Sequence, residues 1–470
     1  MKQSWLRVCV FLALAAGLAV AIDVFGRLAS DVAARLPSAA AASLPPPVTA
    51  DLVRPTTAWL PERAAALSPI DRPFGQLHAW SESLASPAWA ITVLLVALIV
   101  SVAVLRGGRG VGQHDASAHG RALRVSPLVT VPLAVGLLAW IVVSRAPQAF
   151  WDEAFVFASQ ARNLAESGVA GVAVSGPHPF AESSADVGIT YVGGLLVLIA
   201  GGIHGETAVV LATLAIAVAC AMGAAALLYR WFRVPPLSAA LLTTTVVILQ
   251  AGGLAAAASA FGTMAATGAL TVLVLGTVRS FRVRSPWPLV LTGFVAGVIR
   301  WDYGFIALAA LIVLAVLTAW DVRGRWSVGW RGALKPMIGG LVVAVGLLAA
   351  ESAYRVIQFG AAMPSGVAFK RMGLDGAYLS SGISYLMDQQ AVMWWNILLA
   401  VVVAAIVVLA RGWRGAAFVA LGVASAPMIA SVVAGGDWFS PFWSRYVVPT
   451  AGALTILLAI VLVEAGAGCA

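Results

Sequence analysis

The chain alternates long apolar runs with short polar segments. Because a helix needs about 20 mostly apolar residues to cross a bilayer, this pattern predicts about twelve spans. A further apolar segment, 188–203, is short and contains two glycine pairs, so we expect it to re-enter or to lie on the membrane surface. The predicted spans are 5–26, 88–105, 126–144, 207–229, 237–254, 262–278, 287–300, 303–320, 337–357, 394–410, 415–433 and 446–464.

The arginine-rich segments predict which loops face the cytoplasm. All of them do so if the amino terminus is inside, residues 145–187 are outside and 188–203 does not cross. The carboxyl terminus is then inside as well. The basic clusters are Arg106–Arg124, Arg230–Arg233, Arg279–Arg284, Arg323–Lys335 and Arg411–Arg414.

Composition agrees with an all-α polytopic membrane protein. The 470 residues are 61% hydrophobic and only 10% charged, and the mean hydropathy is +0.94. The net charge of +9 is explained by the arginines of the predicted cytoplasmic loops. The sequence contains no basic stripe interleaved with aromatic residues that would indicate a nucleic-acid partner. The three cysteines form no disulfide framework, and the sequence contains no phosphate-binding loop or zinc-protease motif.

Two parts of the chain differ in organisation. Residues 1–125 form an amino-terminal extension, in which the proline-rich segment 27–87 is predicted to lie outside and a basic linker inside. The run 5–26 is either a retained anchor or a signal peptide cleaved after Ala19-Val20-Ala21. Residues 126–470 form the transmembrane core.

The polar interruption 145–187 places Asp152 and Glu153 at the mouth of a membrane segment, where a charge is costly to hold without a purpose. The residues after them predict an amphipathic helix that ends at Gly168. On that helix Asp152, Ser159 and Asn163 share one face, and Glu153 points about 100° away. We therefore expect one acid to face a cavity while the other orients a partner or holds an ion.

Three further polar motifs are predicted on the same outer face. Lys370 and Arg371 are cations outside, against the prevailing bias, and suit either a donor phosphate or ordinary anchoring to lipid. Arg300 either contacts a phosphate or forms a local ion pair with Asp302. Asp437 and Arg445 belong either to the same site or to a tight outer turn held by an Asp–Arg pair.

These motifs, in this order, resemble the polyprenyl-phosphate-dependent membrane glycosyltransferases of the C type. The closest branch contains the actinobacterial terminal arabinofuranosyltransferases. The resemblance covers about 126–464, and residues 1–125 have no counterpart in it. It departs from the family at Glu153, where the family has Asp, at Trp301, where it has Pro, and at Ser365-Gly366, where it has Asn-Thr. The soluble carboxyl-terminal domain of those enzymes has no counterpart here either.

The resemblance implies a C-type bundle with a long catalytic outer loop. It implies transfer of a sugar, arabinofuranosyl in that branch, from a polyprenyl phosphate to a cell-envelope glycan at the outer face of the plasma membrane. Asp152 would deprotonate the acceptor, supported by Glu153. A divalent cation such as Mg²⁺ or Mn²⁺ would lie at Glu153 or Asp437 if the site uses one. The residues that would contact the donor phosphate or substrate are Arg162, Arg300, Lys370, Arg371, Asp437 and Arg445.

Two other classes of function remain open from the sequence. A transporter or flippase of a lipid-linked sugar predicts charges in the middle of spans and inverted repeats, and neither stands out. A catalytically inactive membrane scaffold would use the proline-rich extension to bind other envelope proteins. Glu351 and Arg355, spaced i and i+4, are expected to be a simple ion pair on one helix.

Overall fold

The computed structural model describes residues 152–173, 180–181, 186–200, 205–248, 262–323, 330–359, 376–388, 390–409, 414–433 and 446–467. This part is almost entirely helical. A minimal antiparallel pair of two-residue strands, β1 (Val172–Ala173) and β2 (Phe180–Ala181), follows the first helix. The predicted spans 5–26, 88–105 and 126–144 and the whole extension 1–125 lie outside the described residues.

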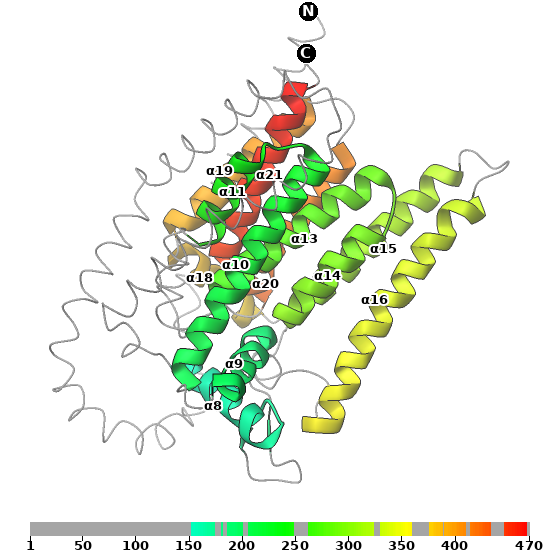
Figure 1. The fold of residues 1–470 in the computed structure, drawn as a ribbon. Coiled ribbons are helices and arrows are strands. Elements are labelled where there is room, and N and C mark those ends of the chain that lie inside the picture. The colour runs from blue at the N-terminus through cyan, green and yellow to red at the C-terminus, as the bar shows by residue number, and fades with distance from the viewer. Residues whose placement is uncertain are drawn as a thin grey trace, which may run out of the picture.

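The described helices form one bundle with α8 and α9 at one end, as Figure 1 shows. The helices are α8 (Asp152–Ser167), α9 (Val187–Ala200), α10 (Gly205–Phe232), α11 (Pro236–Val247), α13 (Thr263–Val283), α14 (Trp287–Ile299), α15 (Trp301–Arg323), α16 (Trp330–Phe359), α18 (Gly376–Asp388), α19 (Gln390–Leu409), α20 (Arg414–Val433) and α21 (Val447–Ala467).

Helix α13 is the centre of the bundle. It is buried along nearly its whole length and packs against α10, α14, α20 and α21. Small residues allow these close approaches: a Cβ on Gly268 would lie 2.5 Å from the Cβ of Cys220 on α10. Helix α16, in contrast, lies at the periphery against α14 and α15 (Figure 1). Most of its apolar side chains are exposed.

Four described helices are long and apolar enough to cross a membrane. They contain Ala208–Phe232, Thr263–Val283, Trp301–Ala319 and Leu334–Phe359. Of the other apolar helices, α19, α20 and α21 have 20, 20 and 21 residues, but only shorter stretches of them have described side chains. Two predicted spans, 237–254 and 287–300, are helices of 12 and 13 residues. Helix α14 is short because it begins after Pro286 and ends where Arg300 adopts an extended backbone. A membrane protein is thus supported, while a bundle of twelve spans stays a prediction.

The segment expected not to cross is α9. With 14 residues it measures roughly 21 Å along its axis, which is less than the roughly 30 Å hydrocarbon core of a bilayer. It packs against α8 and α10 and contacts the end of α14. A Cβ on Gly188 would lie 2.8 Å from the Cα of Ile299, so a glycine is needed at this contact. That 188–203 does not cross stays a prediction, because α11 and α14, which are predicted spans, are shorter than α9.

Candidate functional site

The carboxylate-bearing helix α8 (Asp152–Ser167) ends at Gly168, as its sequence predicted. Gly168 has a φ of +74°, and its N–H donates to the carbonyl of Leu164 at 3.0 Å. Asn163, expected on the same helix face as Asp152, donates its side-chain amide to the carbonyl of Gly171 at 2.7 Å. Its role is therefore to hold the loop that follows the helix.

Helices α8 and α9 lie side by side and run in the same direction. Gln160 on α8 accepts a hydrogen bond from Thr190 on α9 at 3.3 Å, and both side chains are buried. Further along, Gly194 of α9 meets Leu164 of α8. The later residue of α8 thus contacts the later residue of α9, which means that the two helices are parallel. Their beginnings therefore lie at the same end of the pair. Asp152 and Glu153 begin α8, and Asp186 directly precedes α9.

Asp186 belongs to a group that we call the charged cluster: Asp186, Arg300, Asp302, Tyr303 and Tyr446. Asp186, Arg300 and Tyr303 are buried, and Asp302 and Tyr446 are partly buried. The Nη1 of Arg300 donates to the Oδ1 of Asp186 at 3.3 Å, and its Nε donates to the Oδ1 of Asp302 at 2.9 Å. The arginine is only 3% exposed, and its Cζ lies 5.5 Å and 5.3 Å from the ring centroids of Tyr303 and Tyr446. Two carboxylates and one guanidinium leave a formal charge of −1.

The charged cluster joins segments that are far apart in the chain. Asp186 precedes α9, Arg300 lies between α14 and α15, and Tyr446 precedes α21. The beginning of α13 is also close, since a Cβ on Gly262 would lie 2.7 Å from the carboxyl carbon of Asp186. The cluster therefore fixes the geometry of the bundle end where α8 and α9 lie.

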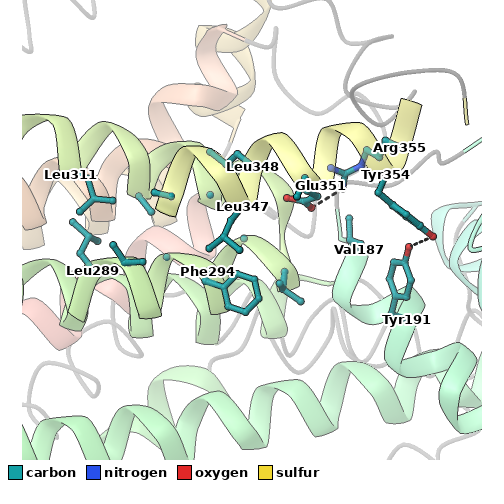
Figure 2. Close-up of a pocket in the computed structure, with 18 residues that line it drawn as sticks. Val187, Tyr191, Leu289, Phe294, Leu311, Leu347, Leu348, Glu351, Tyr354 and Arg355 are labelled. Carbon is teal, nitrogen blue, oxygen red and sulfur yellow. Dashed lines mark hydrogen bonds and ion pairs between the residues drawn. The ribbon is translucent and has the colours of Figure 1, made fainter. Parts of the chain in front are cut away.

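An apolar groove of about 390 Å³ runs from this region between α14, α15 and α16 (Figure 2). Phe294 from α14, Leu311 from α15 and Leu347 from α16 line its walls, and Val187 and Tyr191 of α9 lie at one end. The outer face of α14 beside it exposes large apolar side chains, including Leu291 and Val298. The groove thus lies on a side of the bundle suited to contact with lipid.

The α9 end of the groove is polar. The Nη2 of Arg355 donates to the Oε1 of Glu351 at 3.0 Å, and the guanidinium lies 5.4 Å from the ring centroid of Trp301. The hydroxyl of Tyr191 donates to that of Tyr354 at 2.8 Å (Figure 2). Since Trp301 follows Arg300 directly, the polar end of the groove and the charged cluster are neighbours.

The ion pair of Glu351 and Arg355 is confirmed, but it is more than a pair on one helix. Both residues line the groove, and Arg355 is 2% exposed. A buried charge in an apolar helix is costly, which makes this pair a candidate part of the site. The sequence did not predict that this pair lines a groove, because helical spacing alone gives no information on which face of α16 is covered.

The structure brings together only part of the predicted site. The local pair of Arg300 with Asp302 is confirmed, and any phosphate at Arg300 would compete with two carboxylates. Arg162 is exposed and is not part of the charged cluster. For Asp152 and Glu153 the structure describes the backbone alone, and their roles stay predictions. The remaining predicted residues, Lys370, Arg371, Asp437 and Arg445, lie outside the described residues.

Asp186 is the site residue that the sequence argument missed. It stands directly before an apolar segment, in the same way as Asp152 and Glu153 stand at a helix start, and this position was an available signal. Among the described residues, no group of three or more His, Cys, Asp or Glu side chains could hold a metal ion. The predicted metal positions, Glu153 and Asp437, stay predictions.

Comparison with protein-family models, curated proteins and solved structures gives no significant match to this chain. Its class therefore follows from the fold. The described part is an all-helical protein with four candidate membrane spans. At one end of this bundle, an apolar groove adjoins a buried cluster of charges.

Proposed function

We propose that this protein is a membrane glycosyltransferase that moves a sugar from a polyprenyl phosphate to a cell-envelope glycan at the outer face of the membrane. The observation that carries the proposal is that three features lie toward the same end of the bundle. These are the beginning of α8 with Asp152 and Glu153, the charged cluster, and the polar end of the groove. The likeness of the loop motifs to C-type glycosyltransferases supports the same function and favours an arabinofuranosyl donor.

The arrangement suits a lipid-linked substrate. The groove is lined by apolar side chains along α14 and α16, as a hydrocarbon chain requires. Its polar end would leave the headgroup near the beginnings of α8 and α9. The reacting sugar is then held where carboxylates are available and where lipid gives way to water.

The proposed chemistry needs a base and a stabilised leaving group. Asp152 accepts the proton of the acceptor hydroxyl, the acceptor oxygen bonds to the anomeric carbon, and the polyprenyl phosphate departs with the electrons of the broken bond. Lys370 and Arg371 stabilise the phosphate as it leaves, and Asp437 and Arg445 complete the substrate contacts. Glu153 orients the acceptor or holds a divalent cation. This mechanism inverts the configuration at the anomeric carbon.

In this proposal Arg300 positions the helix ends around the site and does not contact the donor. Its guanidinium is engaged by Asp186 and Asp302 and enclosed by two tyrosine rings, so it holds the ends of several helices in register. A direct contact with the donor phosphate would need these carboxylates to move.

One observation favours transport of a lipid-linked sugar as a second candidate. The Glu351–Arg355 pair lies within the candidate span Leu334–Phe359 and lines the groove, as polar residues on a transport path do. Membranes incubated with radiolabelled polyprenyl-phosphate sugars distinguish the two functions. A glycosyltransferase yields labelled glycan and free polyprenyl phosphate, whereas a transporter moves the intact lipid to the other leaflet.

A further inference from the structure

The hydrogen bond between Tyr191 and Tyr354 joins two helices, α9 and α16, that have few other contacts. We call this pair the tyrosine bridge. The residues are 163 positions apart in sequence, and their hydroxyl oxygens are 2.8 Å apart. Helix α9 packs mainly against α8, α10 and α14, and α16 packs mainly against α15 and α14. The bridge therefore crosses the end of the groove and is not part of a continuous helix interface (Figure 2).

The surroundings of the bridge are fixed on both sides. The beginning of α9 is held by Asp186 on Arg300 and by the contact of Gly188 with Ile299. On α16, Arg355 is buried against Trp301. Opening the bridge thus needs rotation of side chains and no movement of helices.

The bridge itself is accessible and easily exchanged. Tyr354 is 37% exposed, and the hydrogen bond lies in an exposed position. A hydroxyl there can replace its tyrosine partner by water or by a polar headgroup, so the bond adds little to the stability of the fold. Its position over the polar end of the groove gives it a different use.

We propose that the tyrosine bridge is a gate over the polar end of the groove, which opens to admit a lipid phosphate and closes behind its headgroup. The inference rests on the proposed function, because it takes the ligand to be a lipid with a long apolar chain and a phosphate. The bridge closes around the first part of the chain, beside Val187 and Glu351, and the headgroup lies beyond it toward the charged cluster. Closure slows both entry and release of the lipid.

The gate predicts a kinetic signature that differs from that of an ordinary binding contact. Tyr354→Phe and Tyr191→Phe each remove the hydrogen bond and keep the ring. The rates of association and dissociation of a fluorescent short-chain polyprenyl phosphate should both rise by about 2- to 10-fold, the range for one lost hydrogen bond, with little change in Kd. Loss of a binding contact would instead raise the dissociation rate and Kd together. Tyr229→Phe on α10 is the control and should change neither rate.

Two results would overturn the gate. If Tyr354→Phe alters the rates as strongly in a Tyr191→Phe background as alone, the two hydroxyls do not act together. The second test links the two positions covalently in a variant that carries both Tyr191→Cys and Tyr354→Cys. Cys9 and Cys469 are replaced by Ser, and the buried Cys220 is retained. A bifunctional thiol reagent should then join the two introduced cysteines and hold the gate closed. Linked protein that still binds and releases the probe at the unmodified rates contradicts the proposal.

The probe separates this inference from the proposed function. It carries no sugar, so a protein that transfers no sugar can still show the predicted change in rates. A protein that transfers sugar normally and shows unchanged rates in both Phe variants loses the gate alone. If the unmodified protein does not bind the probe at all, both the gate and the lipid-phosphate donor are wrong.

Discussion

Arg300 and Asp186 are 114 residues apart in the chain and form a buried ion pair, with Nη1 and Oδ1 3.3 Å apart. The exposed fractions of the two side chains are 4% and 8%. This contact holds the beginning of α9 on the junction of α14 and α15. Because α9 also carries Tyr191 and packs on α8, the pair links the carboxylate helix to the groove.

Asp186→Ala should destabilise the protein strongly. Removing one partner of a buried ion pair typically costs up to about 3–5 kcal/mol, and the remaining bond of Arg300 to Asp302 lowers that cost here. Asp302→Ala should cost less, because the Asp302 side chain is 24% exposed and water can replace it. Thermal unfolding in detergent, with the exposed Arg162→Ala as control, measures the order. Equal losses for Asp186→Ala and Arg162→Ala would contradict the cluster.

Arg300→Lys distinguishes a positioning role from a phosphate contact. Lysine keeps the charge but cannot donate in two fixed directions or stack as a planar group between Tyr303 and Tyr446. We expect an apparent melting temperature well below that of the unmodified protein, and a loss of activity that follows the loss of folded protein. A stable Arg300→Lys variant in which only the KM for the donor rises would assign Arg300 to the phosphate instead.

Lys370 and Arg371 are expected to bind the donor phosphate. Lys370→Ala and Arg371→Ala should raise the KM for the donor, and should also lower kcat if the contact strengthens as the phosphate departs. Lys335→Ala is a matched control, because Lys335 is an exposed cation near the other end of α16. Unchanged donor kinetics in both loop variants would leave these residues as lipid anchors.

The predicted orientation can be tested at the end of α13. Arg282 is exposed and belongs to a cluster expected to be cytoplasmic, so an impermeant thiol reagent should not label Arg282→Cys in intact cells. Ser280 would be a poor choice, because it is fully buried and its hydroxyl accepts the N–H of Leu289 at 2.8 Å. Labelling of Arg282→Cys from outside would reverse the orientation and remove the outer-face site.

The sequence predicted the local features of this structure better than its contacts. The end of α8 at Gly168 and the pairing of Arg300 with Asp302 follow from neighbouring residues, and both are found. The contact of Asp186 with Arg300 depends on how α9 packs against α14, which no local pattern specifies. The groove likewise depends on the placement of α16, whose two faces are almost equally apolar.

The most direct test of the proposed function is sugar transfer by the Asp152→Asn variant. Asparagine keeps the shape of the side chain and removes its basicity, so turnover of a radiolabelled polyprenyl-phosphate sugar should fall about a hundredfold or more, with protein level unchanged. Glu153→Gln should have a smaller effect, unless a chelator already abolishes the activity of the unmodified protein. Near-normal transfer by Asp152→Asn, together with a large loss in Asp437→Asn, would place the base in the other loop and contradict the assignment.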